Sequence, residues 1–283
     1  MPFIDQADAR LYYEETGSGY PIVFVHEFAA DAREWEHQLR AFSRDYRCIA
    51  FNARGYPPSD VPADAVRYGW ESSRDDLLAM LNGLKIDKAH LVGLSMGAYT
   101  ALAFGMRHPD RVSAIVAAAC GSGSPPSLRA NFIRDAKNTA QAFLELGSAA
   151  LAEVIGHSPT RIQLKRKDPR AWAEFMSHLR EHSAEGSSHT MARYQAGRPS
   201  LWSFEAELRR LRLPVLVAVG DEDEPCVEAS LYLKRHLPNA GLWMAPNTGH
   251  AINLEEPAAF NQVTGDFFSA VGRGAWRRGF ADG

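Results

Sequence analysis

The sequence predicts an α/β fold in which helices pack on both faces of a mostly parallel central sheet. Short apolar runs bounded by turn residues alternate with longer helical stretches, the pattern of parallel strands joined by crossover helices. Between about 124 and 205 the strand-like runs stop, so this segment is expected to form a helical insertion. We therefore predict a core formed by residues 1–123 and 206–283, interrupted by a helical segment at 124–205.

The first core part is predicted to begin with two edge strands and continue with buried ones. An edge hairpin is expected over Phe3 to Tyr13, then buried strands over Pro21 to His26 and Arg47 to Phe51. Their continuous apolar character is typical of strands covered on both faces. A helix is predicted over Arg74 to Leu84.

A strand, a glycine-flanked turn and a helix follow in close succession. The apolar run Ala89 to Val92 predicts a strand, and a helical stretch from Ala98 to His108 ends at Pro109. The next strand is predicted over Arg111 to Ala118.

The rest of the chain contributes the inserted helices and two further strands. Helices are expected over Asn131 to Leu146 and Pro169 to His182 in the insertion. Strands are predicted over Pro214 to Gly220 and Gly241 to Ala245, with a helix from Val227 between them.

The turn after the strand at 89–92 reads Gly93-Leu94-Ser95-Met96-Gly97. A serine with glycines two before and two after, between a strand and a helix, is typical of an elbow that exposes a nucleophilic hydroxyl. The glycines are expected because a side chain at either position would collide with the neighbouring strand or helix. Ser95 is therefore the predicted nucleophile.

An acid and a histidine follow in the order that such a serine requires. Asp221, Glu222 and Asp223 come directly after the strand at 214–220, and His250 follows the strand at 241–245. Since carboxyl ends of parallel strands share one edge of a sheet, these side chains are expected near Ser95.

With these motifs the chain resembles the α/β-hydrolase superfamily over nearly its full length. The resemblance rests on the serine elbow, on Gly220 to Asp223, on Gly249-His250 leading into Leu254 to Pro257, and on Asn52 to Gly55. It implies that residues 124–205 form a lid over the active-site face. It also implies that the acid stands three residues after Gly220, which selects Asp223, and leaves Asp221 and Glu222 as turn or helix-capping residues.

The predicted chemistry is acyl transfer to a serine. A serine hydroxyl is a poor nucleophile at neutral pH, so His250 is expected to accept its proton and return it to the leaving group. Asp223 is expected to fix the imidazole tautomer and to stabilise the imidazolium. The backbone N–H groups of Phe28 and Met96 are the expected oxyanion hole.

Glu27 departs from the family pattern, in which glycine usually follows the histidine that is His26 here. An ionised carboxylate about 5 Å from the oxyanion costs on the order of 3 kcal/mol at an effective dielectric of about 20. That is roughly a hundredfold in rate. Three interpretations are open: Glu27 points away or pairs with a cation, it faces the pocket as a substrate contact, or the hole is damaged. We favour the first interpretation. Because the triad is otherwise complete, our hypothesis is that Glu27 marks a specialised substrate and not a dead site.

Composition argues for a compact enzyme without nucleic-acid or membrane partners. The chain has 283 residues, 46% of them hydrophobic, and a formal net charge of −3. Three cysteines and no N-terminal apolar stretch behind basic residues predict a cytoplasmic location. No cofactor or metal is expected, and the four histidines of the insertion are expected at the surface. Arg54 is expected to be structural and Cys120 to be a buried, inert thiol.

The leading prediction is a serine hydrolase of a small ester, lactone or related carbonyl compound. A carbon–carbon bond hydrolase of ring-cleavage diketones would use the same triad and lid. A haloalkane dehalogenase or epoxide hydrolase is disfavoured, because each needs aspartate where Ser95 stands. A ligand receptor without turnover is the alternative from another class. The sequence does not predict an oligomeric state.

Overall fold

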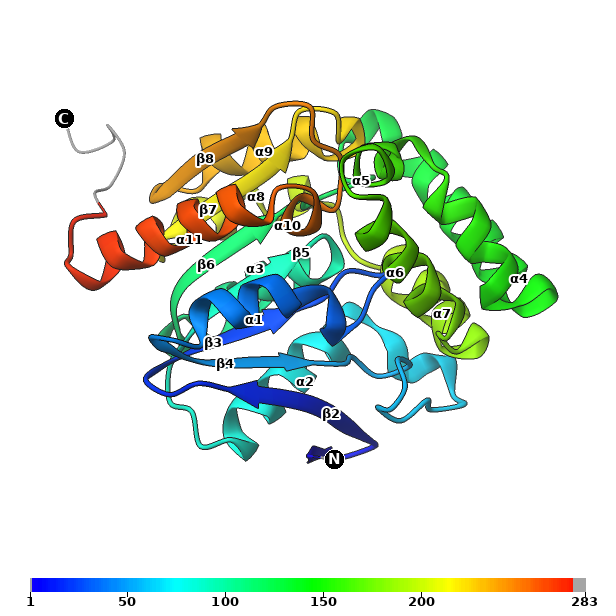
Figure 1. The fold of residues 1–283 in the computed structure, drawn as a ribbon, viewed down its shortest axis with the longest axis horizontal. Helices are drawn as coiled ribbons and strands as arrows, with labels where there is room; N and C mark the ends of the chain where they lie inside the picture. Colours follow the sequence, from blue (N-terminus) through cyan, green and yellow to red (C-terminus); the bar gives the residue numbers. More distant parts are fainter. Residues whose placement is uncertain (1, 277–283) are drawn as a thin grey trace.

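An eight-stranded sheet with the order β1-β2-β4-β3-β5-β6-β7-β8 forms the centre of the protein (Figure 1). The computed structural model describes residues 2–276. The strands are β1 (Phe3–Gln6), β2 (Ala9–Thr16), β3 (Tyr20–Val25), β4 (Tyr46–Phe51), β5 (Ala89–Leu94), β6 (Val112–Ala118), β7 (Val215–Gly220) and β8 (Ala240–Ala245).

Strands β3 to β8 pair in parallel, while β1 and β2 pair antiparallel with each other and β2 with β4. The predicted edge hairpin and the buried parallel strands are therefore confirmed. Every residue of β5 and β7 is buried, as expected for central strands with helices on both faces. The carboxyl ends of the parallel strands meet at the edge of the sheet that faces the inserted helices (Figure 1).

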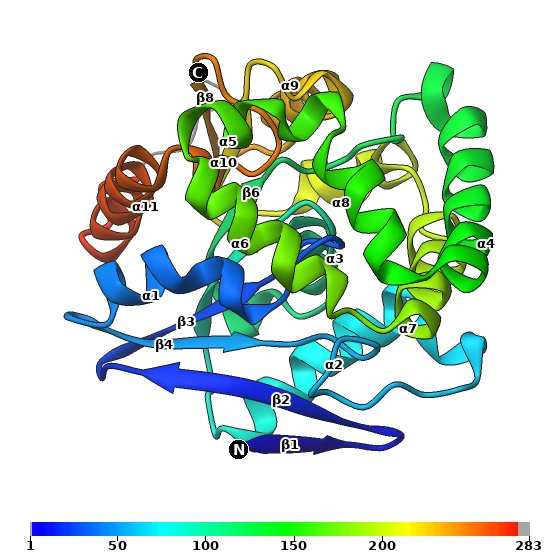
Figure 2. The same ribbon diagram turned by 45° about the vertical axis from the view of Figure 1, so that its right-hand side comes forward.

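Two helical layers cover the sheet (Figures 1 and 2). On one face α1 and α11 bury Phe42 and Phe268 against the strands. On the other face α2, α3 and α9 pack against the strands and bury residues such as Leu77 and Leu233. The helices of the core are α1 (Glu36–Phe42), α2 (Trp70–Gly83), α3 (Met96–Arg107), α8 (Glu205–Arg210), α9 (Glu224–His236), α10 (Ile252–Glu255) and α11 (Pro257–Gly272).

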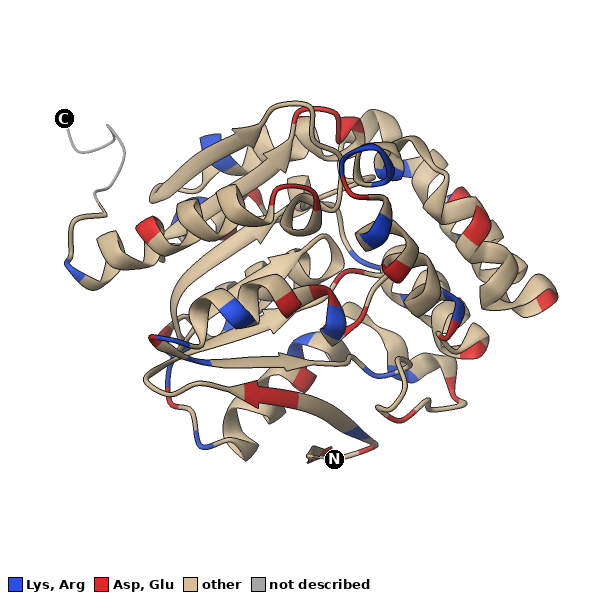
Figure 3. Ribbon diagram, in the orientation of Figure 1, with Lys and Arg blue, Asp and Glu red and all other residues tan. Residues whose placement is uncertain are grey.

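The inserted helices gather at the carboxyl ends of the strands (Figure 2). They are α4 (Pro126–Gly156), α5 (Ile162–Lys167), α6 (Pro169–Arg180) and α7 (Ala184–His189). Helix α4 runs further than predicted in both directions and is broken at Gly147, where φ is 80° and ψ is 165°. The last turn of α5 is basic (Figure 3), and its Lys167 Nζ lies 2.6 Å from Glu256 Oε1 of the core. Among residues 2–276, no helix is long and apolar enough to cross a membrane.

Candidate active site

Ser95 lies on a strained turn between β5 and α3. Its φ of 53° and ψ of −106° place it outside the regions that non-glycine residues ordinarily adopt. The turn is possible only because Gly93 and Gly97, on either side of it, have no side chains. A Cβ on Gly97 would lie 1.9 Å from the Val25 carbonyl oxygen, and one on Gly93 would lie 2.4 Å from the backbone of Gly97. The elbow therefore has the geometry that its two glycines predict.

Asp223 and His250 form a buried hydrogen-bonded pair. The loop after β8 brings His250 Nδ1 to 2.8 Å from Asp223 Oδ2, and the Asp223 side chain is fully buried. Burial lowers the pKa of His250, but the charge and hydrogen bond of Asp223 outweigh it, so this pKa is raised above its usual value. Asp223 stands at the start of α9, yet its carboxylate contacts the imidazole instead of capping the helix.

Ser95, Asp223 and His250 line one cavity of about 250 Å³ at the carboxyl edge of the sheet. The three predicted side chains are thus brought to one place. Among residues 2–276, no hydrogen bond joins the Ser95 hydroxyl to the imidazole. Instead, His250 Nε2 lies 3.7 Å from Glu27 Oε2.

The loop after β3 is held by its neighbours in a fixed shape. His26 Nδ1 lies 2.6 Å from the Glu27 carbonyl oxygen, and His26 Nε2 accepts a hydrogen bond from the Ala53 N–H at 3.0 Å. The hydroxyl of Tyr56 donates to the Phe28 carbonyl oxygen at 2.9 Å. Within residues 2–276 the Phe28 and Met96 N–H groups donate to no other group, and Phe28 lines the same cavity as Ser95.

Glu27 both pairs with a cation and lines the cavity. Its side chain is 2% exposed, and Oε2 accepts a hydrogen bond from Arg161 Nη2 at 2.5 Å. Its other oxygen, Oε1, is buried without a partner in the described part of the chain. Arg161 comes from the inserted segment, just before α5, and neighbouring Thr160 accepts the His250 N–H at 3.0 Å. The insertion therefore contacts both Glu27 and the loop that carries His250.

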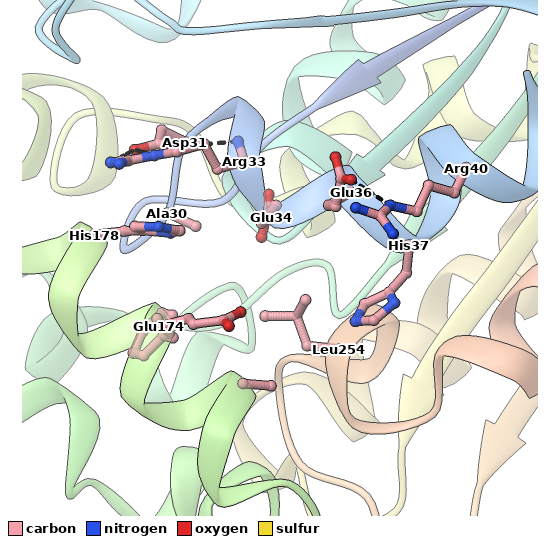
Figure 4. Close-up of a pocket in the computed structure, with 12 residues that line it drawn as sticks. Ala30, Asp31, Arg33, Glu34, Glu36, His37, Arg40, Glu174, His178 and Leu254 are labelled. Atoms are coloured by element: carbon pink, nitrogen blue, oxygen red, sulfur yellow. Dashed lines mark hydrogen bonds and ion pairs between the residues drawn. The ribbon is translucent and has the colours of Figure 1, made fainter.

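A second buried carboxyl, Glu34, supports the backbone of Glu27. Glu34 Oε1 accepts the Glu27 N–H at 2.9 Å, and burial together with the charge of Glu27 raises the pKa of Glu34 well above its usual value. Glu34 also lines a separate cavity of about 250 Å³ between α1 and α6. Figure 4 shows Glu34 and Glu174 on opposite sides of this cavity, with His178 nearby.

Cys226 lies beside the candidate triad and was not singled out from the sequence. Its Sγ is 3.9 Å from His250 Nδ1 and 3.2 Å from the Ala119 carbonyl oxygen. Asp223, Cys226 and His250 have potential metal-ligand atoms within 4.8 Å of one another. Burial raises the pKa of Cys226 well above its usual value, which favours a neutral thiol over the thiolate that binds metals.

Several expectations for neighbouring residues need correction. His182 is buried, and its Nε2 lies 3.5 Å from Asp31 Oδ2, so it is not a surface histidine. Helix α9 begins at Glu224, before the predicted Val227. Of the two expectations for Asp221, turn residue or helix cap, the structure agrees with the first: Asp221 lies in the turn after β7, and its Oδ1 accepts the Thr248 N–H at 3.1 Å.

Two of the remaining expectations agree with the structure. Arg54 is 4% exposed and bonds both oxygens of Asp76, at 2.6 and 2.8 Å, which is a structural contact away from the cavity. Cys120 is fully buried, and burial raises its pKa to about 12, so it remains an inert thiol at neutral pH.

The family follows from comparison with known proteins. A family model described as the alpha/beta hydrolase fold matches residues 20–257, so the chain belongs to the α/β-hydrolase family. A 2-hydroxymuconate semialdehyde hydrolase of Pseudomonas is 26% identical, covering 93% of this chain and 92% of its own length. A 2-hydroxy-6-oxo-6-phenylhexa-2,4-dienoate hydrolase of Burkholderia cepacia is 25% identical, covering 92% and 91%.

Solved structures agree on the fold. A thermophilic esterase from Thermogutta terrifontis superposes with a TM-score of 0.84 at 25% identity, covering 95% of this chain and 98% of that one. An enol-lactonase from Burkholderia xenovorans superposes with a TM-score of 0.82 at 24% identity, covering 95% and 100%. The homologues support a hydrolytic enzyme, and their varied names leave its reaction open.

Proposed function

We propose that this protein is a serine hydrolase that cleaves a small ester, lactone or related carbonyl compound with Ser95, His250 and Asp223. The observation that carries the proposal is the buried 2.8 Å pair of Asp223 and His250 in the same cavity as a serine on a strained elbow. Such a turn stores backbone strain that a mere connection does not need. Residues 124–205 would act as the lid of this cavity.

The reaction follows from what each group can do. His250 accepts the Ser95 proton as the hydroxyl attacks the substrate carbonyl, and Asp223 stabilises the imidazolium that forms. The imidazolium then protonates the leaving group, and water releases the acyl group by the same route in reverse. In the structure the imidazole faces Glu27, so a small movement of His250 or Ser95 must accompany substrate binding.

The Phe28 and Met96 N–H groups would hold the oxyanion, since neither donates elsewhere in the described chain. The charge of Glu27 is compatible with an oxyanion at this site, because Glu27 is paired with Arg161. The positive charge of Arg161, 2.5 Å from Glu27 Oε2, opposes the repulsion, on the order of 3 kcal/mol, that an isolated carboxylate about 5 Å away would exert. We therefore assign Glu27 a role in substrate contact through its unpartnered Oε1.

A fluorophosphonate probe tests the nucleophile directly. The wild-type protein should be labelled at Ser95, and Ser95→Ala should lose both labelling and ester turnover. Ser122→Ala is the matched control, because Ser122 lines the same cavity and should keep both. Labelling that persists in Ser95→Ala would refute the assignment. A ligand receptor on this fold would instead bind without measurable turnover in the wild type.

Two relatives give a specific reason to test carbon–carbon bond cleavage as well. Both are named as hydrolases of a semialdehyde or dienoate, and both match more than 90% of this chain. A screen of short acyl esters, lactones and ring-cleavage diketones would decide between the two reactions. If only diketones are turned over, carbon–carbon bond cleavage replaces ester or lactone hydrolysis as the assigned reaction. The same screen tests the role of Glu27 with the variants Glu27→Gln and Glu27→Gly. Unchanged activity in both variants would show that Glu27 has no role in substrate contact.

A further inference from the structure

Arg198 is a buried cation in the cavity that holds Ser95, and within residues 2–276 it has no counter-charge. Arg198, from the inserted segment, is 2% exposed and lines the cavity together with Ser95 and Glu27. The other charged groups of the lining are matched, since Asp223 contacts His250 and Glu27 contacts Arg161. Within residues 2–276, no carboxylate lies within ion-pair distance of Arg198. A buried charge without a partner is costly, so this position calls for an anion.

The guanidinium of Arg198 is held in place by its neighbours, and in the described residues its buried Nε–H has no acceptor. Its Nη2 donates to the Ser122 carbonyl oxygen at 2.7 Å, and its Cζ lies 5.0 Å from the ring centre of Tyr99 and 5.3 Å from that of Phe132. Stacking on two rings fixes the plane of the group. Its Nε is buried and has no hydrogen-bond partner in the described residues. An unsatisfied donor on a fixed, buried cation is an incomplete arrangement unless a ligand supplies the acceptor.

A second arginine strengthens the positive charge at this place. Arg129 Nη2 donates to the Arg198 carbonyl oxygen, while Arg129 Nη1 is buried without a partner among residues 2–276. Both guanidinium groups lie near Phe132, at 5.9 and 5.3 Å from its ring centre. The charge of Arg198 acts unfavourably on the neighbouring Arg129 cation, and an anion bound at Arg198 would reduce this repulsion.

We propose that Arg198, supported by Arg129, binds a carboxylate of the substrate, so that the preferred substrates are small esters or lactones carrying a free acid group. A planar carboxylate matches the fork of a guanidinium, which can bind its two oxygens through two parallel N–H donors. Glu27 lines the same cavity, and its Oε1 has no partner in the described residues, which suits a substrate that also presents a hydroxyl or amino donor. The proposal rests on the proposed function for turnover, but not for binding.

The kinetic test compares matched esters that differ only in charge. The 4-nitrophenyl half-esters of glutaric and adipic acid are compared with the 4-nitrophenyl esters of the corresponding methyl-terminated acids. Hydrogen bonds to charged groups contribute about 1.5–3 kcal/mol, or roughly 10- to 150-fold. We expect the wild type to prefer the better-fitting half-ester, and Arg198→Gln to lower its kcat/KM relative to the neutral ester by about that factor. Arg198→Lys should recover part of the preference.

A matched control separates this effect from a general loss of positive charge. Arg166→Gln removes a cation from the same insertion at an exposed position, so it should leave the selectivity ratio unchanged. If Arg198→Gln and Arg198→Lys lower turnover of the charged and neutral esters equally, Arg198 only supports the fold and the proposal is overturned. The same conclusion follows if the wild type prefers the neutral esters.

A binding measurement keeps this proposal distinct from the proposed function. Glutarate and adipate are titrated calorimetrically into Ser95→Ala, with the corresponding diamides as neutral controls. Binding of a dicarboxylate at least tenfold tighter than its diamide, and lost in the Arg198→Gln variant of Ser95→Ala, supports the anion site even if no ester is hydrolysed. Equal binding of diacid and diamide, or no binding of either, overturns the anion site even if esters are turned over.

Discussion

At the scale of single residues, the imidazole of His250 lies between two carboxylates. Asp223 contacts Nδ1 at 2.8 Å, and Glu27 Oε2 lies 3.7 Å from Nε2. Both charges favour the imidazolium and oppose the lowering of the pKa by burial, while Arg161 acts in the opposite direction. Because the proposed mechanism needs neutral imidazole, a raised pKa moves the onset of activity to higher pH.

We predict that Glu27→Gln moves the acid limb of the pH profile of kcat/KM to lower pH. The substitution removes an anion that stabilises the imidazolium and leaves the Arg161 cation uncompensated, and both changes lower the pKa of His250. The profile is measured with a neutral ester between about pH 5 and 9, with exposed Glu145→Gln as the control. A limb that stays in place or moves to higher pH would show that Glu27 does not act on the imidazole.

Glu34 gives a second prediction at this scale, on stability. Its folded-state pKa is raised by burial and by Glu27, so the folded protein holds this proton more tightly than the unfolded chain does. Stability from this group is therefore present at low pH and is lost as pH rises from the unfolded-state pKa through the folded-state pKa. The glutamine of Glu34→Gln cannot ionise, so this variant does not lose that stability. The free energy of unfolding of the variant, relative to that of the wild type, should therefore increase as pH rises.

Urea unfolding at pH 5 and pH 8 measures this effect. Glu36→Gln is the control, because Glu36 is 54% exposed and belongs to the same segment of chain. A difference between Glu34→Gln and the wild type that is the same at both pH values would mean that Glu34 does not change its ionisation on folding.

At the scale of elements, the elbow depends on how closely α3 approaches β3. A Cβ on Gly97 would meet the Val25 carbonyl oxygen at 1.9 Å, which neither backbone can accommodate in place. We predict that Gly97→Ala costs about 1–3 kcal/mol, as overpacking does, and sharply reduces fluorophosphonate labelling. Gly265→Ala is the control, since its Cβ would meet only Phe42 Cε1 at 3.7 Å and α11 should gain about 0.5–1 kcal/mol. Full labelling of Gly97→Ala would contradict this account of the elbow.

The core elements could be predicted because their sequence patterns are local. The parallel strands read as short apolar runs, and the positions of Ser95, Asp223 and His250 follow directly from strand ends. The inserted segment offers no such signal. Arg161 and Arg198 look like ordinary polar residues of a helical region, and only the folding of that region over the strands brings them into the cavity.

Tertiary packing also explains where local reasoning failed. The sequence near His182 is polar, which indicates an exposed position. In the structure its ring lies 5.2 Å from that of Tyr56, in a buried contact between the insertion and the core. Glu27 was identified as a departure from the family pattern, but its partner could not be named because Arg161 lies 134 residues away in the chain.

At the scale of the whole molecule, the insertion and the core meet at the proposed catalytic groups. Glu27 pairs with Arg161, and Lys167 pairs with Glu256. The backbone N–H of His250 donates to the Thr160 carbonyl oxygen. Through these contacts the positions of Glu27 and His250 depend on the conformation of the insertion. A movement of the insertion away from the core would therefore disturb the groups around His250.

The core itself is joined by a buried ion pair far from the cavity. Arg54 follows β4 and bonds both oxygens of Asp76 on α2, with exposed side-chain fractions of 4% and 1%. Removing one partner leaves the other charge buried, which costs about 3–5 kcal/mol. We therefore predict a fall of that size in the free energy of unfolding for Asp76→Asn.

The adjacent residue supplies a matched control for this last prediction. Asp75 is also an aspartate of α2 paired with an arginine, Arg74, but it is 49% exposed. Exposed pairs contribute about 0–1 kcal/mol because water screens them, so Asp75→Asn should change stability little. Chemical denaturation of both variants measures the difference. If the two substitutions cost the same, the Asp8 carboxylate, 3.1 Å from Arg54 Nη2, is enough to hold the buried guanidinium without Asp76.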